Sequence, residues 1–506
     1  MNKMILIVLC SNFFIGCQPY SGVKTNESTQ SKFQTSKYSN EEIIKWTNNQ
    51  IDSIISADNI PALSIGIIKD GKVIMHKGFG VHNRNNKIQA NGNSIYQIAS
   101  DTKKMTGIIA KNLVVKGKLK LDEPIITYFG NSLNSKTKER LRNITLRQLL
   151  LHKSGLPYRQ PTINRKDGEP MLIPYTEKEI LNDLNSIELK SDSGTNFGYS
   201  NFGYAVIGYI CEIVSNKTYT ELIEKYISKA YQMPNTTSSL TNKQLQFLVT
   251  PYRKEDRNKE TSAFKMGKLK AAGGVYSTIN DLSKLMLHQI NTYIEYNQNK
   301  KSNPLLYLNE DNITEENGYG YGLGKKKFNT GTQYGHGGDL DGFASSYVFS
   351  PEYKSGVIIL TSSGGKWVGE LEKKVFYKLT NRKYFSPKKS IAQEVYNIIS
   401  NRGFEEAKKW FKEHKDSDKY YIKEAEINNV GYAFMESKIN DAIEIFEWNT
   451  ESFPESSNAY DSLGEAYLKK GNKELAIKNY ETSIKLNPEN INAKNIIKQI
   501  RTDRKN

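Results

Sequence analysis

The chain has 506 residues, of which 37% are hydrophobic and 25% are charged. This length is enough for a large domain with an appended module, and 31 tyrosines and 19 phenylalanines supply material for buried cores. The formal net charge of +17 could favour anionic lipid or acidic cell-wall polymer, but lysine is abundant throughout, so biased composition explains it better. The region that carries the motifs below has no basic stripe with interleaved aromatic residues, which argues against nucleic-acid binding.

Residues 1–17 are predicted to be a targeting segment. Lys3 gives a positive start, and the apolar stretch from Met4 to Ile15 is too short to span a bilayer. The stretch ends in Phe-Ile-Gly-Cys17, which resembles the signal of bacterial lipoproteins, in which the cysteine is lipidated and becomes the mature N-terminus. We therefore expect lipidation at Cys17 and an exported lipoprotein of the cell envelope. The alternative is an ordinary secretory signal cleaved elsewhere, which also predicts export.

The cysteine pattern agrees with this interpretation. If Cys10 is lost with the signal and Cys17 is lipidated, Cys211 is left alone on an apolar helix as a small core residue. No disulfide and no metal cluster is then expected. Residues 18–40 are rich in Ser, Thr, Gln, Asn and Lys, as in a flexible tether.

Strand patterns occur at both ends of residues 41–381. Two apolar runs between Leu63 and Phe79 are joined by Asp70-Gly71, which predicts a β-hairpin. Two further strand-like runs lie between Ser345 and Thr361, and the stretch between the two ends is mostly helical. A sheet built from both ends with helices inserted predicts an α+β domain over 41–381.

A basic, proline-containing linker is predicted at residues 382–392, and repeats follow over 393–506. Pro454 and Pro488 stand 34 residues apart, and the motif Leu463-Gly-Glu-Ala-Tyr467 closely resembles the tetratricopeptide pattern. Alanines at spacings of 35 and 34 residues open similar helices: Ala407, Ala442 and Ala476. We predict an all-α array, which serves either as a groove for a protein partner or as a structural cap.

The tetrapeptide Ser100-Asp-Thr-Lys103 joins an extended apolar stretch to a helical pattern from Met105 to Val114. Ser100 is therefore expected at a helix N-terminus, with Lys103 one turn later on the same side. Backbone N–H groups there can stabilise an oxyanion, and a desolvated lysine can act as a base. For this motif alone, an N-cap serine beside a solvated lysine is the simpler interpretation.

Tyr199-Ser-Asn201 follows a polar, glycine-containing loop and precedes an apolar helix. The Tyr199 hydroxyl could face a cleft and pass a proton to a leaving group, and Asn201 could bind a substrate amide. With 31 tyrosines in the chain, a packing role is the alternative.

His336-Gly-Gly-Asp339 leads directly into a predicted strand. Gly337 and Gly338 let a ligand backbone approach closely, and an extended edge here could pair with a substrate by β-addition. The amide of Asp339 could then be a second oxyanion donor. A lone histidine is more often structural than catalytic, which is the alternative for His336.

Together these segments resemble the serine β-lactamase and penicillin-binding-protein superfamily, closest to the branch of class C β-lactamases, DD-peptidases and esterases. The resemblance spans residues 41–381. It includes accessory stretches at 149–157, 272–278 and 319–324. It implies an antiparallel sheet flanked by helices, with a helical subdomain.

The resemblance also implies roles for the residues that match its motifs. Ser100 would be the acylated nucleophile, Lys103 its base or proton partner, and Tyr199 the general acid and base. Asn201 would bind substrate together with the strand His336-Gly337-Gly338-Asp339. No metal and no cofactor is implied.

Two positions depart from the pattern. His336 stands where many members have a lysine in a Lys-Thr-Gly strand, and histidine is mostly neutral at pH 7, so strong β-lactamase activity is not expected. Asp101 replaces a more usual small residue and could perturb the electrostatics around Lys103.

Three functional hypotheses follow. The first is an exported serine hydrolase that forms an acyl-enzyme with an amide or ester, most plausibly a D-amino-acid peptide such as a peptidoglycan stem peptide. The second keeps the site but makes the protein an esterase or a weak β-lactamase. The third is a lipid-anchored binding protein that recruits a partner through its repeats and carries a vestigial enzyme fold.

Overall fold

The computed structural model describes residues 34–85, 87–161, 171–253, 257–299, 317–384, 389–415, 417 and 419–502. These residues form two compact units, and the division falls between Tyr384 and Phe385. The predicted signal segment with Cys17, and residues 18–33 of the predicted tether, lie outside the described residues. Within the described ranges, no helix combines the length and apolar character needed to cross a membrane.

A seven-stranded antiparallel sheet forms the centre of the first unit, in the order β2-β1-β9-β8-β7-β6-β5. Its strands are β1 (Ala62–Lys69), β2 (Lys72–Gly80), β5 (Asn317–Gly320), β6 (Leu323–Phe328), β7 (Gly331–Leu340), β8 (Phe343–Ser350) and β9 (Ser355–Thr361). The pairing of β1 with β9 joins the two ends of the segment, as predicted. The α+β fold is confirmed.

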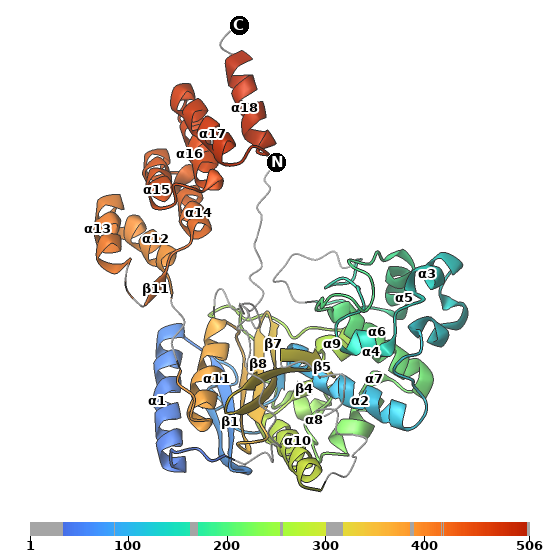
Figure 1. Cartoon of the computed structure of the whole chain (residues 1–506). Coiled ribbons are helices and arrows are strands. Elements are labelled where there is room, and N and C mark those ends of the chain that lie inside the picture. The colour runs from blue at the N-terminus through green and yellow to red at the C-terminus, as the bar shows by residue number, and fades with distance from the viewer. Residues whose placement is uncertain are drawn as a thin grey trace. The chain divides into compact units, whose positions relative to one another are not determined.

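Helices cover both faces of this sheet (Figure 1). The strands β1, β8 and β9 are buried along their whole lengths, which is expected of central strands packed on two sides. One apolar core joins the sheet to α1 (Asn40–Asp58) and α11 (Lys366–Leu379). A second core joins the opposite face to α10 (Ile279–Asn299) and to the helices inserted between β2 and β5.

The inserted helices make the helical subdomain, and α6 (Asn201–Ser215) is its central element. Residues 202–211 of α6 are all buried, Cys211 among them, and α6 packs on α2 (Lys103–Val115) and α9 (Lys270–Gly273). Its remaining α-helices are α3 (Ser135–Leu141), α4 (Leu146–Leu150), α5 (Glu177–Ser186), α7 (Tyr219–Ile223) and α8 (Asn242–Leu245). A short ladder of β3 (Tyr96–Gln97) and β4 (Tyr276–Ser277) lies beside them.

The second unit is helical, apart from a two-residue ladder of β10 (Lys389–Ser390) and β11 (Tyr420–Tyr421). Its helices are α12 (Ile391–Arg402), α13 (Phe404–His414), α14 (Glu424–Met435), α15 (Ile439–Ser452), α16 (Ser457–Lys469), α17 (Lys473–Leu486) and α18 (Ile491–Thr502). The helix α12 begins two residues before the predicted start of the repeats at 393. At Gly431 and Gly464 an added Cβ would lie 2.5 Å from the Phe446 ring and 3.1 Å from the Tyr480 ring, so glycine permits close packing of paired helices.

Candidate active site

Ser100 lies in a short 3-10 turn, η1 (Ala99–Thr102), that runs directly into α2. Ala99 precedes it with φ +50, a left-handed conformation that costs a residue with a side chain about 1–3 kcal/mol. Two hydrogen bonds of Ile98 hold the chain just before this turn. The Ile98 oxygen accepts from the Ser345 hydroxyl at 2.8 Å, and the Ile98 amide donates to Val275 O at 2.9 Å. The turn therefore presents Ser100 at the start of a helix, as predicted.

Lys103 is completely buried, and its Nζ touches three oxygens. The distances are 3.0 Å to Ser100 Oγ, 2.7 Å to Asn201 Oδ1 and 2.7 Å to the backbone oxygen of Ala272. All three partners are neutral. Burial without a carboxylate beside the amine lowers the pKa of Lys103 well below its usual value. A neutral amine at 3.0 Å can accept the Ser100 proton.

Tyr199 lies just before α6, half-buried, with its ring centroid 5.0 Å from Lys103 Nζ. Ser200 is the N-cap of α6, and its hydroxyl accepts from the Gly203 amide at 2.8 Å. Asn201 is therefore the first residue of the helix, where its side-chain oxygen meets Lys103. The structure thus brings Ser100, Lys103, Tyr199 and Asn201 together.

The strand β7 passes directly beside η1. An added Cβ at Gly338 would lie 2.3 Å from Ile98 O and 2.8 Å from the Ala99 Cβ, so only glycine fits there. The strand β6 pairs with β7 only up to Gly335, whereas β8 pairs with it up to Leu340. The backbone from His336 to Asp339 therefore pairs with β8 but not with β6, and it lies next to the turn that carries Ser100.

His336 and Asp339 take different positions on β7. The His336 ring lies among aromatic rings, 5.6 Å from that of Tyr319 and 6.1 Å from that of Tyr199. Burial lowers the pKa of His336 to about 3, so the imidazole is neutral at pH 7. The Asp339 carboxylate lies against Gly364, where an added Cβ would be 2.4 Å away. Since side chains alternate along a strand, this carboxylate is on the face opposite Gly338.

Asp101 pairs with Lys104 and not with Lys103. Both side chains are fully buried and form a close ion pair, and Lys104 Nζ also donates to Asp101 O at 3.0 Å. Lys104 Nζ lies 3.9 Å from the centre of the Tyr347 ring. The low pKa of Lys103 comes from its burial. The Asp101 carboxylate is therefore neutralised by Lys104, and the pKa of Lys103 is set by burial and not by Asp101.

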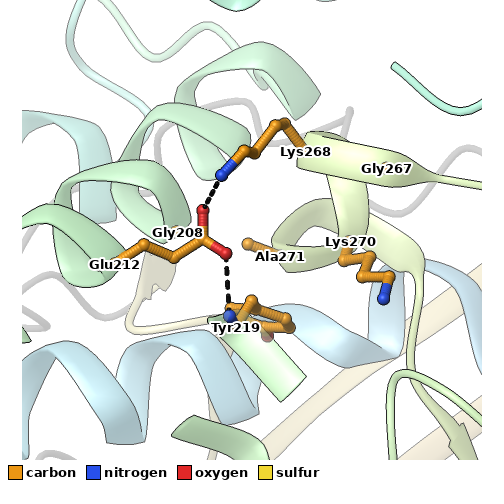
Figure 2. A pocket seen from close by; sticks show the side chains of 7 residues that line it. All are labelled: Gly208, Glu212, Tyr219, Gly267, Lys268, Lys270 and Ala271. Atoms are coloured by element: carbon orange, nitrogen blue, oxygen red, sulfur yellow. Dashed lines mark hydrogen bonds and ion pairs between the residues drawn. The ribbon is translucent and has the colours of Figure 1, made fainter. Parts of the chain in front are cut away.

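A small recess lies where α6, α7 and the start of α9 meet (Figure 2). The recess has a volume of about 10 Å³, and the Glu212 carboxylate accepts there from Lys268 Nζ at 2.7 Å and from the Tyr219 amide at 2.8 Å. An added Cβ at Gly208 would lie 2.2 Å from the Ala271 Cβ, so α6 and α9 pack without a gap. This contact places Ala272, whose backbone oxygen bonds Lys103.

The motifs did not reveal every residue of the site. Ala272 contributes a backbone oxygen, which has no sequence signature. His152 belongs to the accessory stretch 149–157, to which no role was assigned, yet its ring lies 4.3 Å from that of Tyr199. Within the described ranges, no group of three or more His, Cys, Asp or Glu side chains is placed to hold a metal ion.

An antiparallel sheet with a helical insertion that places a Ser-x-x-Lys turn beside one strand defines the β-lactamase and transpeptidase fold class. The profile of the Beta-lactamase family matches residues 48–379, and the chain belongs to this family. A tetratricopeptide repeat profile matches residues 457–490.

Three relatives illustrate the similarity. Protein flp of Staphylococcus aureus strain MW2 is 28% identical over 370 residues, covering 70% of this chain and 71% of flp. The D-alanyl-D-alanine-carboxypeptidase/endopeptidase AmpH of Escherichia coli K12 is 27% identical over 243 residues, 48% of this chain and 61% of AmpH. The octameric penicillin-binding protein homologue from Pyrococcus abyssi superposes with a TM-score of 0.56 at 27% identity, over 67% of this chain and 78% of that one.

The buried ion pair should behave as a unit. Asp101→Ala leaves Lys104 buried without a counter-charge, so we expect the free energy of unfolding of the first unit to fall by about 3–5 kcal/mol. Adding Lys104→Met to Asp101→Ala should recover most of this loss. Urea unfolding of both variants checks the expectation, and additive losses in the double variant would contradict it.

Acid should destabilise the first unit partly through His336. The unfolded histidine titrates near 6.5 and the folded one at about 3, so between these values the unfolded state binds the extra proton. Stability is then lost as pH falls from 6.5 towards 3. His336→Gln should lose less thermal stability than the wild type over this window, as read from melting temperatures. Equal slopes would refute the assignment.

The packing of α6 on α9 should be intolerant of one methyl group. Gly208→Ala is expected to push α9 away, destabilise the fold by about 1–3 kcal/mol and slow the acylation of Ser100. The matched control is Gly369→Ala in α11, where an added Cβ meets nothing within 4 Å. This control should be neutral or stabilising by up to about 1 kcal/mol. Equal behaviour of the two variants would contradict the close contact.

Proposed function

We propose that the protein is a serine hydrolase that forms an acyl-enzyme at Ser100. The observation that carries the proposal is the buried Lys103 amine, held by neutral partners 3.0 Å from Ser100 Oγ. A serine hydroxyl is a weak nucleophile at neutral pH and needs such a base. An amine with a lowered pKa is available in its free form at a pH where an ordinary lysine is charged.

In the acylation step, Ser100 Oγ attacks the substrate carbonyl carbon while its proton passes to Lys103 Nζ. The backbone N–H groups of Ser100 and of Asp339 on β7 receive the developing oxyanion. The leaving group departs with a proton delivered through Tyr199. In the second step, water gives a proton to the same network and attacks the ester, which releases the acid and restores the Ser100 hydroxyl.

The substrate we favour is a peptide with D-amino acids. Two observations support it: the similarity to AmpH, which is described as a D-alanyl-D-alanine-carboxypeptidase/endopeptidase, and the run of β7 past Gly335, which could add an extended peptide as a further strand. We also propose that Asn201, whose side-chain oxygen lies 2.7 Å from Lys103 Nζ, binds a substrate amide.

An ester substrate is the second candidate, and His336 favours it. A lysine at this position carries a fixed charge that holds a substrate carboxylate, whereas the imidazole here is neutral at pH 7. A substrate without a carboxylate loses no binding interaction when histidine stands here in place of lysine. The same reasoning makes strong β-lactamase activity an unfavoured outcome.

The cellular location of the protein and its partner are also proposals. We infer export and lipid anchoring at Cys17 from the signal pattern of residues 1–17. The helices of the second unit, which include a matched tetratricopeptide repeat, are proposed to bind a protein partner.

Covalent labelling tests the proposed activity. The full chain is treated with a fluorescent penicillin and, separately, with a fluorophosphonate, and the adduct is located by peptide mass spectrometry. We expect a label on Ser100 from at least one reagent, loss of label in Ser100→Ala, and at least a hundredfold slower labelling in Lys103→Met.

Turnover then separates the substrates, by comparing a D-Ala-D-Ala peptide with a short-chain ester. Failure of both reagents to label a folded protein, verified by circular dichroism, would refute the hydrolase and favour a binding protein with a vestigial site.

A further inference from the structure

His152 is a buried residue beside the site with no part in the mechanism above. It follows α4, is only 1% exposed, and has φ +55. A left-handed backbone is strained for a residue with a side chain. Such a conformation persists where surrounding contacts hold it.

Two of those contacts are made to the residues on either side of Tyr199. The backbone oxygen of His152 accepts from the Gly198 amide at 2.7 Å. Its ring Nδ1 accepts from the Ser200 amide at 3.1 Å. One residue therefore holds the chain immediately before and immediately after Tyr199.

The ring of His152 also supports the Tyr199 ring directly. The two centroids are 4.3 Å apart, and the Tyr204 and Tyr319 rings lie 4.9 Å and 4.6 Å from His152 on other sides. The buried Nε2 has no hydrogen-bond partner among the described residues. Because Nδ1 accepts, it must carry a lone pair, and a neutral ring then bears its proton on Nε2.

We propose that His152 is the positioning residue for Tyr199: its backbone oxygen and ring hold residues 198–200 beside Lys103. This inference rests on the proposed function, in which Tyr199 moves a proton. A protonated ring would lose the Ser200 bond, because Nδ1 would become a donor.

The surroundings keep the ring neutral. The charged or titratable groups that face it are Lys103 from α2, His336 from β7, Tyr319 from β5 and Tyr199 with Tyr204 around α6. None of these is an acid that ionises near pH 7. Burial lowers the pKa of His152 well below its usual value.

Two substitutions separate the hydrogen bond from the packing. His152→Asn keeps an acceptor near the place of Nδ1 and tolerates a left-handed backbone, but it loses the ring. His152→Phe keeps a ring and loses the acceptor. Both are made in the full chain, and thermal melting reports whether each folds.

The first readout is independent of catalysis. Hydrogen exchange of the peptide covering residues 198–203 should be faster in His152→Phe than in the wild type, and close to wild type in His152→Asn. The second readout is the rate of Ser100 labelling. It should fall by about ten- to a hundredfold in His152→Phe, because a misplaced catalytic group costs rate, and by clearly less in His152→Asn.

A double-variant cycle with Tyr199→Phe completes the test. If His152 acts through Tyr199, the double variant His152→Phe with Tyr199→Phe should be labelled less than threefold more slowly than Tyr199→Phe alone. Wild-type exchange in His152→Phe, equal losses in the two His152 variants, or additive losses in the cycle would each overturn the proposal. If the wild type is never labelled, the proposed function fails, and the exchange comparison alone still decides whether His152 holds the segment.

Discussion

Burying an amine away from water without a counter-ion costs free energy when the amine is charged, and that cost shapes the site around Lys103. Its three partners are oxygens of neutral groups, contributed by η1, α6 and α9. Each element is held in turn by contacts of its own, such as the Ser345 bond behind η1 and the packing of Gly208 on Ala271 behind α9. The surrounding fold therefore keeps the amine buried and its pKa low.

The sheet supplies the second constraint, because β7 must lie close to the nucleophile turn without a side chain between them. Gly338 meets that requirement, and the neighbouring His336 lies among aromatic rings. A site with a neutral imidazole in this place favours a substrate that needs no fixed cation.

Charges elsewhere in the site are arranged so that they do not disturb the reacting amine. Asp101 and Lys104 neutralise each other next to the nucleophile. His152 and His336 are both neutral at pH 7 because burial disfavours their protonated forms. The mechanism that we propose, in which a proton passes between Ser100, Lys103 and Tyr199, would therefore take place among few competing charges.

Local patterns were enough to predict the α+β fold, the hairpin at Asp70-Gly71 and the helix that starts after Ser100, since turns, strands and helices follow from neighbouring residues. The spacing of Ser100 and Lys103 by one helical turn was likewise readable. Sequence alone did not predict that Asp101 would form its ion pair with Lys104 or that the backbone oxygen of Ala272 would bond Lys103. It also did not predict that His152 would bond the residues on either side of Tyr199. These contacts join segments distant in the chain, or select one of two adjacent lysines, and only packing in three dimensions decides them.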